Sequence, residues 1–223
     1  MFLERLIKRI RRKFSKPSTE EKRLQEIYDI FASSPDSGWI VSWKEAKKIH
    51  QLIKIRNSKN ALELGTGIGT AAAIMANAMG ENGKVTTLEQ SEKCLHLARM
   101  LIPPELKRKI NFVLSEPCVL SLPILKQGEK ISGYKKLPVE FGPFDFVLVD
   151  GPGTFEENGE KVRHPNGDLF SLIPHIIPHG IVFVDNRKKA LAFYLKYLLE
   201  YFTVGGSWSN YCFLERTAKK WEK

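Results

Sequence analysis

Residues 61–70 read ALELGTGIGT, and this stretch decides the fold of the 223-residue chain. An apolar run containing Glu63 leads into three glycines at alternate positions, Gly65, Gly67 and Gly69, and the alanine-rich AAAIMANAM follows. The pattern predicts a strand, a tight glycine loop and the start of a helix. In an open α/β sheet this is the place that receives a nucleoside-like ligand.

The spacing of the glycines argues against a pyrophosphate cofactor. A dinucleotide fingerprint sets its third glycine three residues after the second, but Thr70 stands there. Glycines allow close approach of the backbone to a ligand, and the next helix offers free N–H groups to a carboxylate. S-adenosylmethionine has such a carboxylate and no phosphate. We therefore predict contacts to this cofactor from Gly65, Thr66, Gly67 and Gly69.

The next strand supplies a second predicted ligand contact. In KVTTLEQSEKC, residues 85–88 alternate as a strand, Glu89 ends it and Ser91 caps a helix. Glu89 lies 20 residues after Gly69, a separation at which an acid accepts hydrogen bonds from both ribose hydroxyls. We predict that Glu89 and Gln90 bind the cofactor; the alternative is a solvated acid at a strand end.

Together these segments resemble motifs I and II of the class I S-adenosylmethionine-dependent methyltransferases, over roughly residues 38–216. The resemblance implies an α/β, Rossmann-like doubly wound sheet of seven strands in the order 3-2-1-4-5-7-6. It implies a mostly parallel sheet whose antiparallel last strand is 211–215. The acid Glu63 before the glycines and Glu116, in the place that often holds the adenine amino group, are further implied cofactor contacts.

Two later strands carry the predicted chemistry. FDFVLV at 144–149 ends at Asp150, and IVFV at 181–184 ends at Asp185 and Asn186. If these strands are parallel neighbours, their carboxyl ends lie about 5 Å apart. Three oxygen ligands there suit Mg²⁺ or another divalent cation, which would lower the pKa of an acceptor hydroxyl. The trio is similar to the metal ligands of the catechol and caffeoyl-coenzyme A O-methyltransferase branch.

The chain departs from that branch at Gly153, where a lysine is usual. An alternative therefore stays open, in which Asp150 contacts the cofactor or caps a loop and the Asp185–Asn186 pair caps a helix over 188–201. DGPG and VDNRK also resemble a looser group of class I methyltransferases that act on sugars or other hydroxylated molecules. In that group Asp150 is joined by Arg163, which would hold an anionic acceptor, and by His164, which would take its proton.

Two capping patterns predict helices ahead of the glycine loop. Ser18 precedes a helix over 19–31, and Ser42 opens another that runs through Ile55. Residues 39–42 either line the site or pack in the core. Residues 126–142 lack periodicity and are expected to form an insertion or loop near the acceptor.

Composition indicates one domain over residues 17–223. The chain is 43% hydrophobic, enough for a full core, and it has no apolar run long enough to span a membrane. Its three cysteines show no paired spacing for a metal or a redox couple, so we expect a reduced, cytoplasmic setting.

The net charge of +10 is concentrated at the start of the chain, where residues 1–23 hold nine Lys or Arg against three Glu. Residues 1–16 form a separate basic tail with apolar residues at helical spacing. Three roles stay open for residues 1–14: peripheral contact with an anionic membrane, packing on the domain or a second copy, and contact with nucleic acid.

The function favoured by these patterns is O-methylation of a small hydroxylated or glycan-like acceptor. RNA methylation is one alternative, although the sequence lacks interleaved aromatic and basic residues of an RNA-binding module. A non-catalytic S-adenosylmethionine-binding protein at a membrane surface is the other. Neither the acceptor nor the oligomeric state follows from the sequence.

Overall fold

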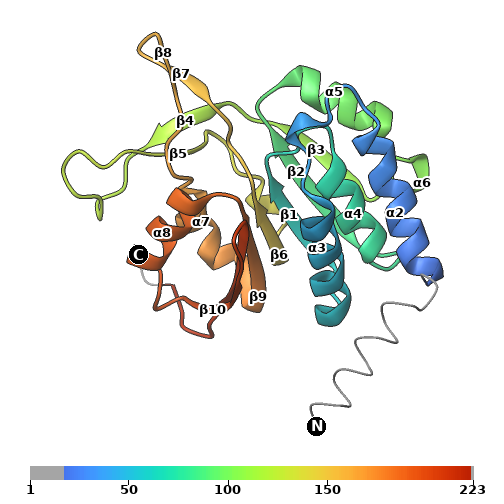
Figure 1. Cartoon of the computed structure of the whole chain (residues 1–223). Helices are drawn as coiled ribbons and strands as arrows, with labels where there is room; N and C mark the ends of the chain where they lie inside the picture. Colours follow the sequence, from blue (N-terminus) through green and yellow to red (C-terminus); the bar gives the residue numbers. More distant parts are fainter. Residues whose placement is uncertain (1–17, 222–223) are drawn as a thin grey trace.

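The computed structural model describes residues 18–221, and its centre is a seven-stranded sheet (Figure 1). From one edge to the other the strands are β10 (Phe202–Ser207), β11 (Tyr211–Arg216), β9 (Ile176–Asp185), β6 (Phe144–Val149), β1 (Asn60–Leu64), β2 (Lys84–Glu89) and β3 (Ile110–Leu114). Neighbours are parallel except for β9 with β11 and β10 with β11. The predicted strand order and the antiparallel last strand are confirmed.

The register of the parallel strands brings the predicted site residues to one edge. Four strand residues pair in a row across the sheet: Leu88, Leu64, Val149 and Val184. The residues that follow them in the chain are Glu89, Gly65, Asp150 and Asp185. Because parallel strands end together, four separate motifs meet at this edge.

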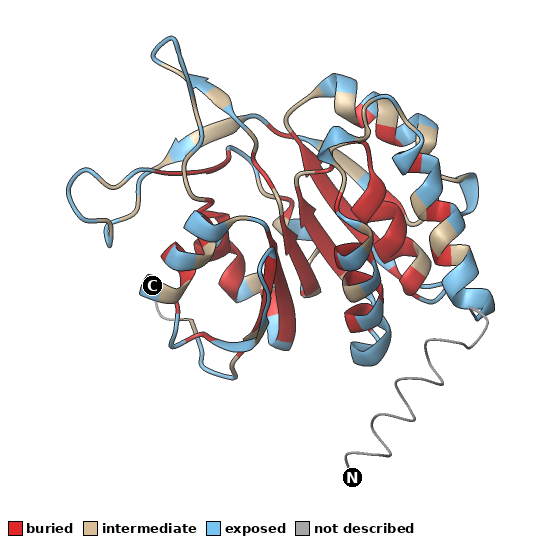
Figure 2. Cartoon of the chain, viewed as in Figure 1, coloured by how far each residue is buried: buried red, intermediate tan, exposed pale blue. Residues whose placement is uncertain are grey.

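Helices cover both faces of the sheet (Figure 2). One core cluster contains residues of α2 (Thr19–Ala32), α3 (Trp43–Arg56), α4 (Thr70–Ala78), α5 (Glu92–Leu101) and α6 (Pro104–Lys107). The cluster on the other face contains residues of α7 (Asp168–Leu172) and α8 (Lys188–Tyr197). In β6, Phe146 and Leu148 join the first cluster while Val147 and Val149 join the second. Burial on both faces explains why the central strands read as continuous apolar runs.

The predicted helix starts are confirmed by their caps. The Ser18 hydroxyl accepts the N–H of Glu21 at 3.1 Å. Ser42 and Glu45 form the full capping box, in which the Ser42 N–H donates to the Glu45 carboxylate at 2.8 Å and the Glu45 N–H to the Ser42 hydroxyl at 3.4 Å. Because Glu45 is fixed in this way, α3 presents it at the edge of the sheet where the site forms.

Two loop segments contain structure that the sequence did not reveal, and one helix ends earlier than expected. The segment 126–142 is no simple loop, because it contains β5 (Ile131–Tyr134), which pairs with β4 (Pro117–Leu120), and the short 3-10 helix Val139–Phe141. The loop after Asp150 contains a hairpin of β7 (Phe155–Glu157) and β8 (Glu160–Val162), which protrudes from the domain in Figure 1. Helix α8 ends at Tyr197 and not at Tyr201. The remaining 3-10 turns are Ser37–Trp39 and Ile173–His175.

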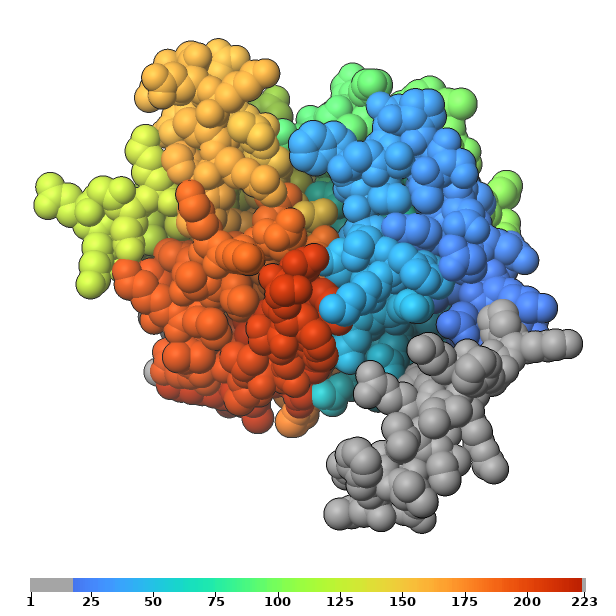
Figure 3. All heavy atoms as spheres, viewed as in Figure 1, coloured from blue at the N-terminus to red at the C-terminus, as the bar shows by residue number. Residues whose placement is uncertain are grey.

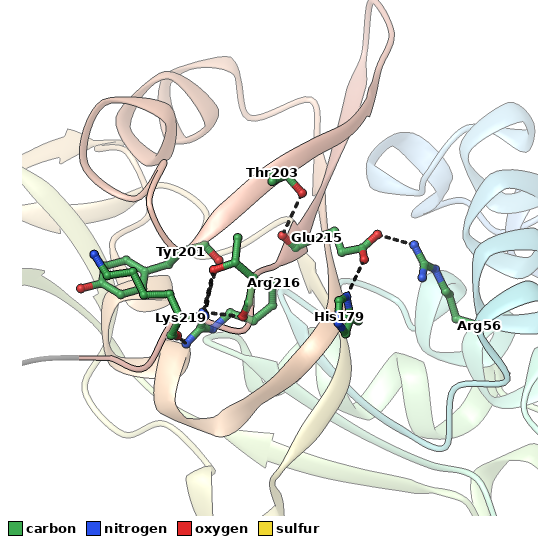
Figure 4. Close-up of polar contacts among 8 residues, drawn as sticks. Arg56, His179, Tyr201, Thr203, Glu215, Arg216 and Lys219 are labelled. Carbon is green, nitrogen blue, oxygen red and sulfur yellow. Dashed lines mark hydrogen bonds and ion pairs between the residues drawn. The ribbon is translucent and has the colours of Figure 1, made fainter.

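Strand β11 is fastened to its surroundings by charged side chains (Figure 4). Glu215 accepts from His179 at 3.0 Å and pairs with Arg56 from the end of α3. The Arg216 guanidinium donates to the carbonyls of Thr217, at 2.8 Å, and Lys219, at 2.6 Å. These contacts hold the antiparallel strand in the sheet beside β9, whose end carries Asp185.

None of the helices within residues 18–221 has the length and apolar character of a membrane span. The predicted basic tail, residues 1–16, lies outside the described part of the chain.

Candidate active site

A cavity of about 730 Å³ lies at the edge where the four motifs meet. Its wall comes from the segment before α3, the glycine loop, the end of β2, the loop after β6 and the end of β9. Figure 3 shows the surface hollowed between the blue segment that precedes α3 and the orange region of the β7–β8 hairpin. The predicted site residues in this wall are Gly65, Gly67, Glu89, Gln90, Asp150, Arg163, Asp185 and Asn186.

The glycine loop is held in a conformation that demands glycine. Gly65 has a φ of +100°, and a Cβ there would lie 2.7 Å from the backbone nitrogen of Gly151. The two loops therefore pack backbone to backbone. Gly69, with a φ of +95°, is the N-cap of α4 and is not part of the cavity wall. Its predicted role as a direct cofactor contact stays a prediction.

Glu89 links strand β2 to the glycine loop. One carboxylate oxygen accepts the N–H of Gly67 at 2.8 Å, and the other accepts the N–H groups of Gln90 at 2.8 Å and Ser91 at 3.0 Å. A carboxylate offers about four acceptor sites and these bonds use three of them, so one is left for a ligand in the cavity. The arrangement fits a sugar hydroxyl that donates to this carboxylate.

Glu63 and Thr66 lie behind the loop and not in the wall of the main cavity. The Thr87 hydroxyl donates to Glu63 at 2.5 Å and lies 2.6 Å from the Thr66 hydroxyl. Burial, opposed by the bond from Thr87, raises the pKa of Glu63 well above its usual range. This buried chain of polar groups supports the loop from below.

Gln90 reaches from β2 to the loop that follows Asp150. Its side-chain oxygen accepts the N–H of Gly153 at 2.9 Å, and its nitrogen donates to the carbonyl of Thr154 at 2.9 Å. Glu116 is placed differently from the expectation, because it is exposed, pairs with Lys135 and is absent from the cavity wall. Strand β3 does not bring its carboxylate to the site.

Asp150 is paired with a cation that sequence reasoning did not assign to the site. Arg187, from the turn after β9, donates through Nε at 3.1 Å to one oxygen of Asp150, and its Nη2 forms an ion pair with the same oxygen at 3.0 Å. Burial raises the pKa of Asp150 to about 6, and the Arg187 guanidinium opposes this rise. The signal in the sequence was the arginine directly after Asp185–Asn186.

Asp185 faces other acids. Burial, and then the nearby carboxylates of Asp150 and Glu45, raise the pKa of Asp185 well above its usual range. Its Oδ1 atom is buried and has no hydrogen-bond partner among the described residues. The two aspartates and Asn186 do reach the same cavity, as predicted.

The arrangement does not fit the predicted divalent cation. The Arg187 guanidinium lies 3.0 Å from Asp150 Oδ1, so a divalent cation on Asp150 would be repelled by a fixed positive charge beside it. In residues 18–221 no group of three or more His, Cys, Asp or Glu side chains is arranged to hold a metal ion. The positive charge expected from a metal is supplied by the protein itself.

Arg163 and His164 share a second cavity, but only Arg163 also reaches the main cavity. Arg163 lines the main cavity and also a second cavity of about 380 Å³, whereas His164 lines only the second. The His164 Nε2 atom lies 3.0 Å from the Glu157 carboxylate of the hairpin. The predicted role of His164 as a base stays a prediction, and the histidine has a carboxylate partner of its own.

Two further residues that the sequence did not reveal hold the edge in place. Tyr134, from β5, is buried and lines the main cavity. The Asn166 amide donates to the carbonyl of Gly151 at 2.9 Å and accepts from the Tyr194 hydroxyl at 2.6 Å. No local pattern marks these residues, because the contacts join β5, α8 and the turn after β6.

The segment before α3 answers the question left open for residues 39–42. Trp39, Ile40 and Ser42 line the main cavity, and Trp39 is 86% exposed. Val41 instead belongs to the core.

A family model described as O-methyltransferase matches residues 14–153, more than half of the chain. The chain belongs to the O-methyltransferase family. Among curated relatives, it is 35% identical over 123 residues to the protein-L-isoaspartate O-methyltransferase of Methanococcus maripaludis, covering 52% of this chain and 50% of the relative. It is 26% identical over 132 residues to caffeoyl-CoA O-methyltransferase 2 of Eucalyptus globulus, covering 59% and 49%.

The fold of this family member is shared with solved structures along nearly its whole length. The O-methyltransferase from Bacillus cereus in complex with SAH has a TM-score of 0.57 and 17% identity, covering 94% of this chain and 96% of that one. TomG from Streptomyces achromogenes, in complex with SAM, has a TM-score of 0.56 and 17% identity, covering 94% of each. By contrast, the chain spans about half the length of the curated relatives it matches.

Proposed function

We propose that this O-methyltransferase family member transfers a methyl group from S-adenosylmethionine to a hydroxyl oxygen of a small or glycan-like acceptor. The proposal rests on the hydrogen bond from the Gly67 N–H to the Glu89 carboxylate, at 2.8 Å, in the wall of the main cavity. A nucleoside seated there would place its sugar on Glu89. The family and the SAH-bound and SAM-bound neighbours with the same fold support this cofactor.

The reaction requires an in-line attack. The acceptor oxygen forms a bond to the methyl carbon while the carbon–sulfur bond breaks, and its electron pair stays on sulfur, leaving S-adenosylhomocysteine. Positioning supplies much of the acceleration of such a step. We propose that the loop after β6 positions the acceptor. The backbone of this loop is fixed at Gly151, which packs against Gly65 and accepts a hydrogen bond from the Asn166 amide.

The acceptor hydroxyl must also lose its proton to a base. We assign this role to Asp150, which follows central strand β6, lines the main cavity and has one oxygen held by Arg187. Its second oxygen is left to accept the hydroxyl proton. Arg187 then stabilises the charged form of Asp150 before the transfer.

A methyl-transfer assay tests the proposal. Labelled S-adenosylmethionine is incubated with the full chain and a panel of sugars, sugar phosphates and phenols, and label in the product is counted. The expected result is label in at least one hydroxylated acceptor, with a loss of about 100-fold in kcat for Asp150→Asn. Cofactor binding without transfer to any member of the panel contradicts the proposal and favours the predicted non-catalytic alternative.

A further inference from the structure

We propose that the second cavity binds a phosphate group of the acceptor, so that the substrate is a small phosphorylated molecule with a hydroxyl that receives the methyl group. This inference rests on the proposed function. The cavity of about 380 Å³ lies against the start of α8, and its wall contains Arg163, Arg187, Lys188 and Lys189.

The two cavities have opposite charge character. The acids Asp36, Glu45, Glu89, Asp150 and Asp185 line the main cavity. Among the described residues that line the second cavity, none is an aspartate or a glutamate. A wall with several cations and no acid attracts an anion and repels a cation.

Three of the cations in the second cavity have no acidic partner in the described part of the chain. Arg187 pairs with Asp150, but no carboxylate of residues 18–221 lies within 4.0 Å of the side-chain nitrogens of Arg163, Lys188 or Lys189. Partial burial and the neighbouring Arg187 guanidinium also lower the pKa of Arg163. Two guanidinium groups that face the same space repel each other until an anion lies between them.

The position of the lysines works against the stability of the free protein. Lys188 and Lys189 open α8, whose first turn has no acidic residue and whose N-cap, Arg187, makes no side-chain capping bond. Cations are unfavourable at a helix N-terminus, where anions are favourable. A phosphate bound beside Lys188 and Lys189 would interact favourably with both lysines and with the helix N-terminus. Such a ligand accounts for the run of three cations at residues 187–189.

The two cavities adjoin and share wall residues. Gly151, Arg163, Asn186 and Arg187 line both of them. In this proposal the acceptor places its hydroxyl at Asp150 and extends past Arg187 into the second cavity. A phosphate, with a charge of about −1.5 to −2 at pH 7 and several acceptor oxygens, matches several cations better than a single carboxylate does.

Binding of inorganic phosphate and pyrophosphate by the full chain, saturated with S-adenosylhomocysteine, tests the inference. Calorimetric titrations are run at constant ionic strength, with sodium chloride as the reference anion. The Lys188→Gln/Lys189→Gln variant is compared with Lys22→Gln/Lys84→Gln, which removes the same charge from exposed lysines on α2 and at the start of β2. Thermal unfolding of both variants shows that they are folded.

The expected result is phosphate and pyrophosphate binding that chloride does not compete away, weakened about tenfold in Lys188→Gln/Lys189→Gln and unchanged in the control. The melting temperature of the α8 variant should equal or exceed that of the wild type, because its helix start is relieved of two cations. Equal loss in both variants, or no binding beyond that of chloride, overturns the inference. S-adenosylhomocysteine is titrated first, before phosphate is added. If it does not bind, the proposed function is contradicted, and this outcome is distinct from a failure of phosphate binding.

Discussion

The Arg187 Nε–H donates a hydrogen bond at 3.1 Å to one oxygen of Asp150, and Arg187 Nη2 forms an ion pair with the same oxygen at 3.0 Å. Asp150 follows β6 and Arg187 follows β9, so the pair joins the carboxyl ends of neighbouring strands. It places a fixed positive charge where the sequence had suggested a metal ion. The pair also separates the acidic cavity from the basic one.

Removal of this arginine should change the response to magnesium. In Arg187→Ala, Asp150 is free to join Asp185 and Asn186 as an oxygen ligand, and a partly buried carboxylate is left unpaired. We expect the variant to lose stability by at least about 1 kcal/mol and to gain melting temperature on addition of Mg²⁺. The wild type should not respond to Mg²⁺, and its turnover should be the same in chelator.

Arg56→Ala is the matched control for this experiment, since Arg56 also pairs with a carboxylate but far from the site, on Glu215 (Figure 4). It should respond to Mg²⁺ no more than the wild type does. A wild-type enzyme that chelator inactivates contradicts the assignment of Arg187.

Replacement of Glu89 by glutamine should weaken cofactor binding. The amide oxygen can accept either the N–H of Gly67 or those of Gln90 and Ser91, but not both, and the variant loses the charge that strengthens a bond to a sugar hydroxyl. We expect the Kd for S-adenosylhomocysteine, measured by calorimetry, to rise about 10- to 100-fold. Glu92→Gln, an exposed acid three residues further on, should leave the Kd unchanged. If Glu89→Gln and the wild type bind S-adenosylhomocysteine with equal affinity, the sugar of the cofactor does not contact Glu89.

Gly65→Ala tests the backbone packing under the site. The added Cβ would lie 2.7 Å from the Gly151 nitrogen, and the alanine would have to adopt a left-handed φ of +100°. Gly159→Ala carries a similar φ, +82°, but its Cβ would meet nothing within 4 Å. The control should cost about 1–2 kcal/mol of unfolding free energy in urea titrations, and Gly65→Ala should cost more and abolish cofactor binding. Similar losses in both variants would show that the two loops are free to separate.

The stability of the domain should carry a pH dependence from Asp168. Burial raises the pKa of this carboxyl from 3.8 to about 7, against hydrogen bonds from the Tyr134 N–H and the Asn166 amide. Because the folded pKa lies above the unfolded one, the stabilisation is full below pH 4 and is lost as the pH rises through 7. Relative to Asp168→Asn, the unfolding free energy of the wild type should fall by up to about 4 kcal/mol over this window. Parallel pH profiles of the two proteins in urea unfolding would contradict the assignment.

The fold was predictable because each element left a local signal. The glycine loop, the Ser42 and Glu45 capping box and the apolar runs of β6 and β9 are all readable from neighbouring residues. The strand order came from the family resemblance. The part of the site on the parallel strands followed, because the strand ends determine where Glu89, Asp150 and Asp185 lie.

The rest of the site depends on contacts between segments far apart in the chain. Arg187 reaches Asp150 across 37 residues, and Asn166 reaches Gly151 and Tyr194 at once. Whether an acid such as Glu116 turns toward a cavity or toward Lys135 is likewise decided by tertiary packing. No spacing rule encodes such choices, so the cation at the site and the basic cavity became visible only in the structure.

The most direct test of the account is calorimetric titration of the full chain with S-adenosylhomocysteine and, separately, with NAD⁺. The account predicts saturable one-to-one binding of S-adenosylhomocysteine that is weakened in Glu89→Gln, and no binding of NAD⁺. A chain that fails to bind S-adenosylhomocysteine, or that binds NAD⁺ in its place, would contradict the central claim.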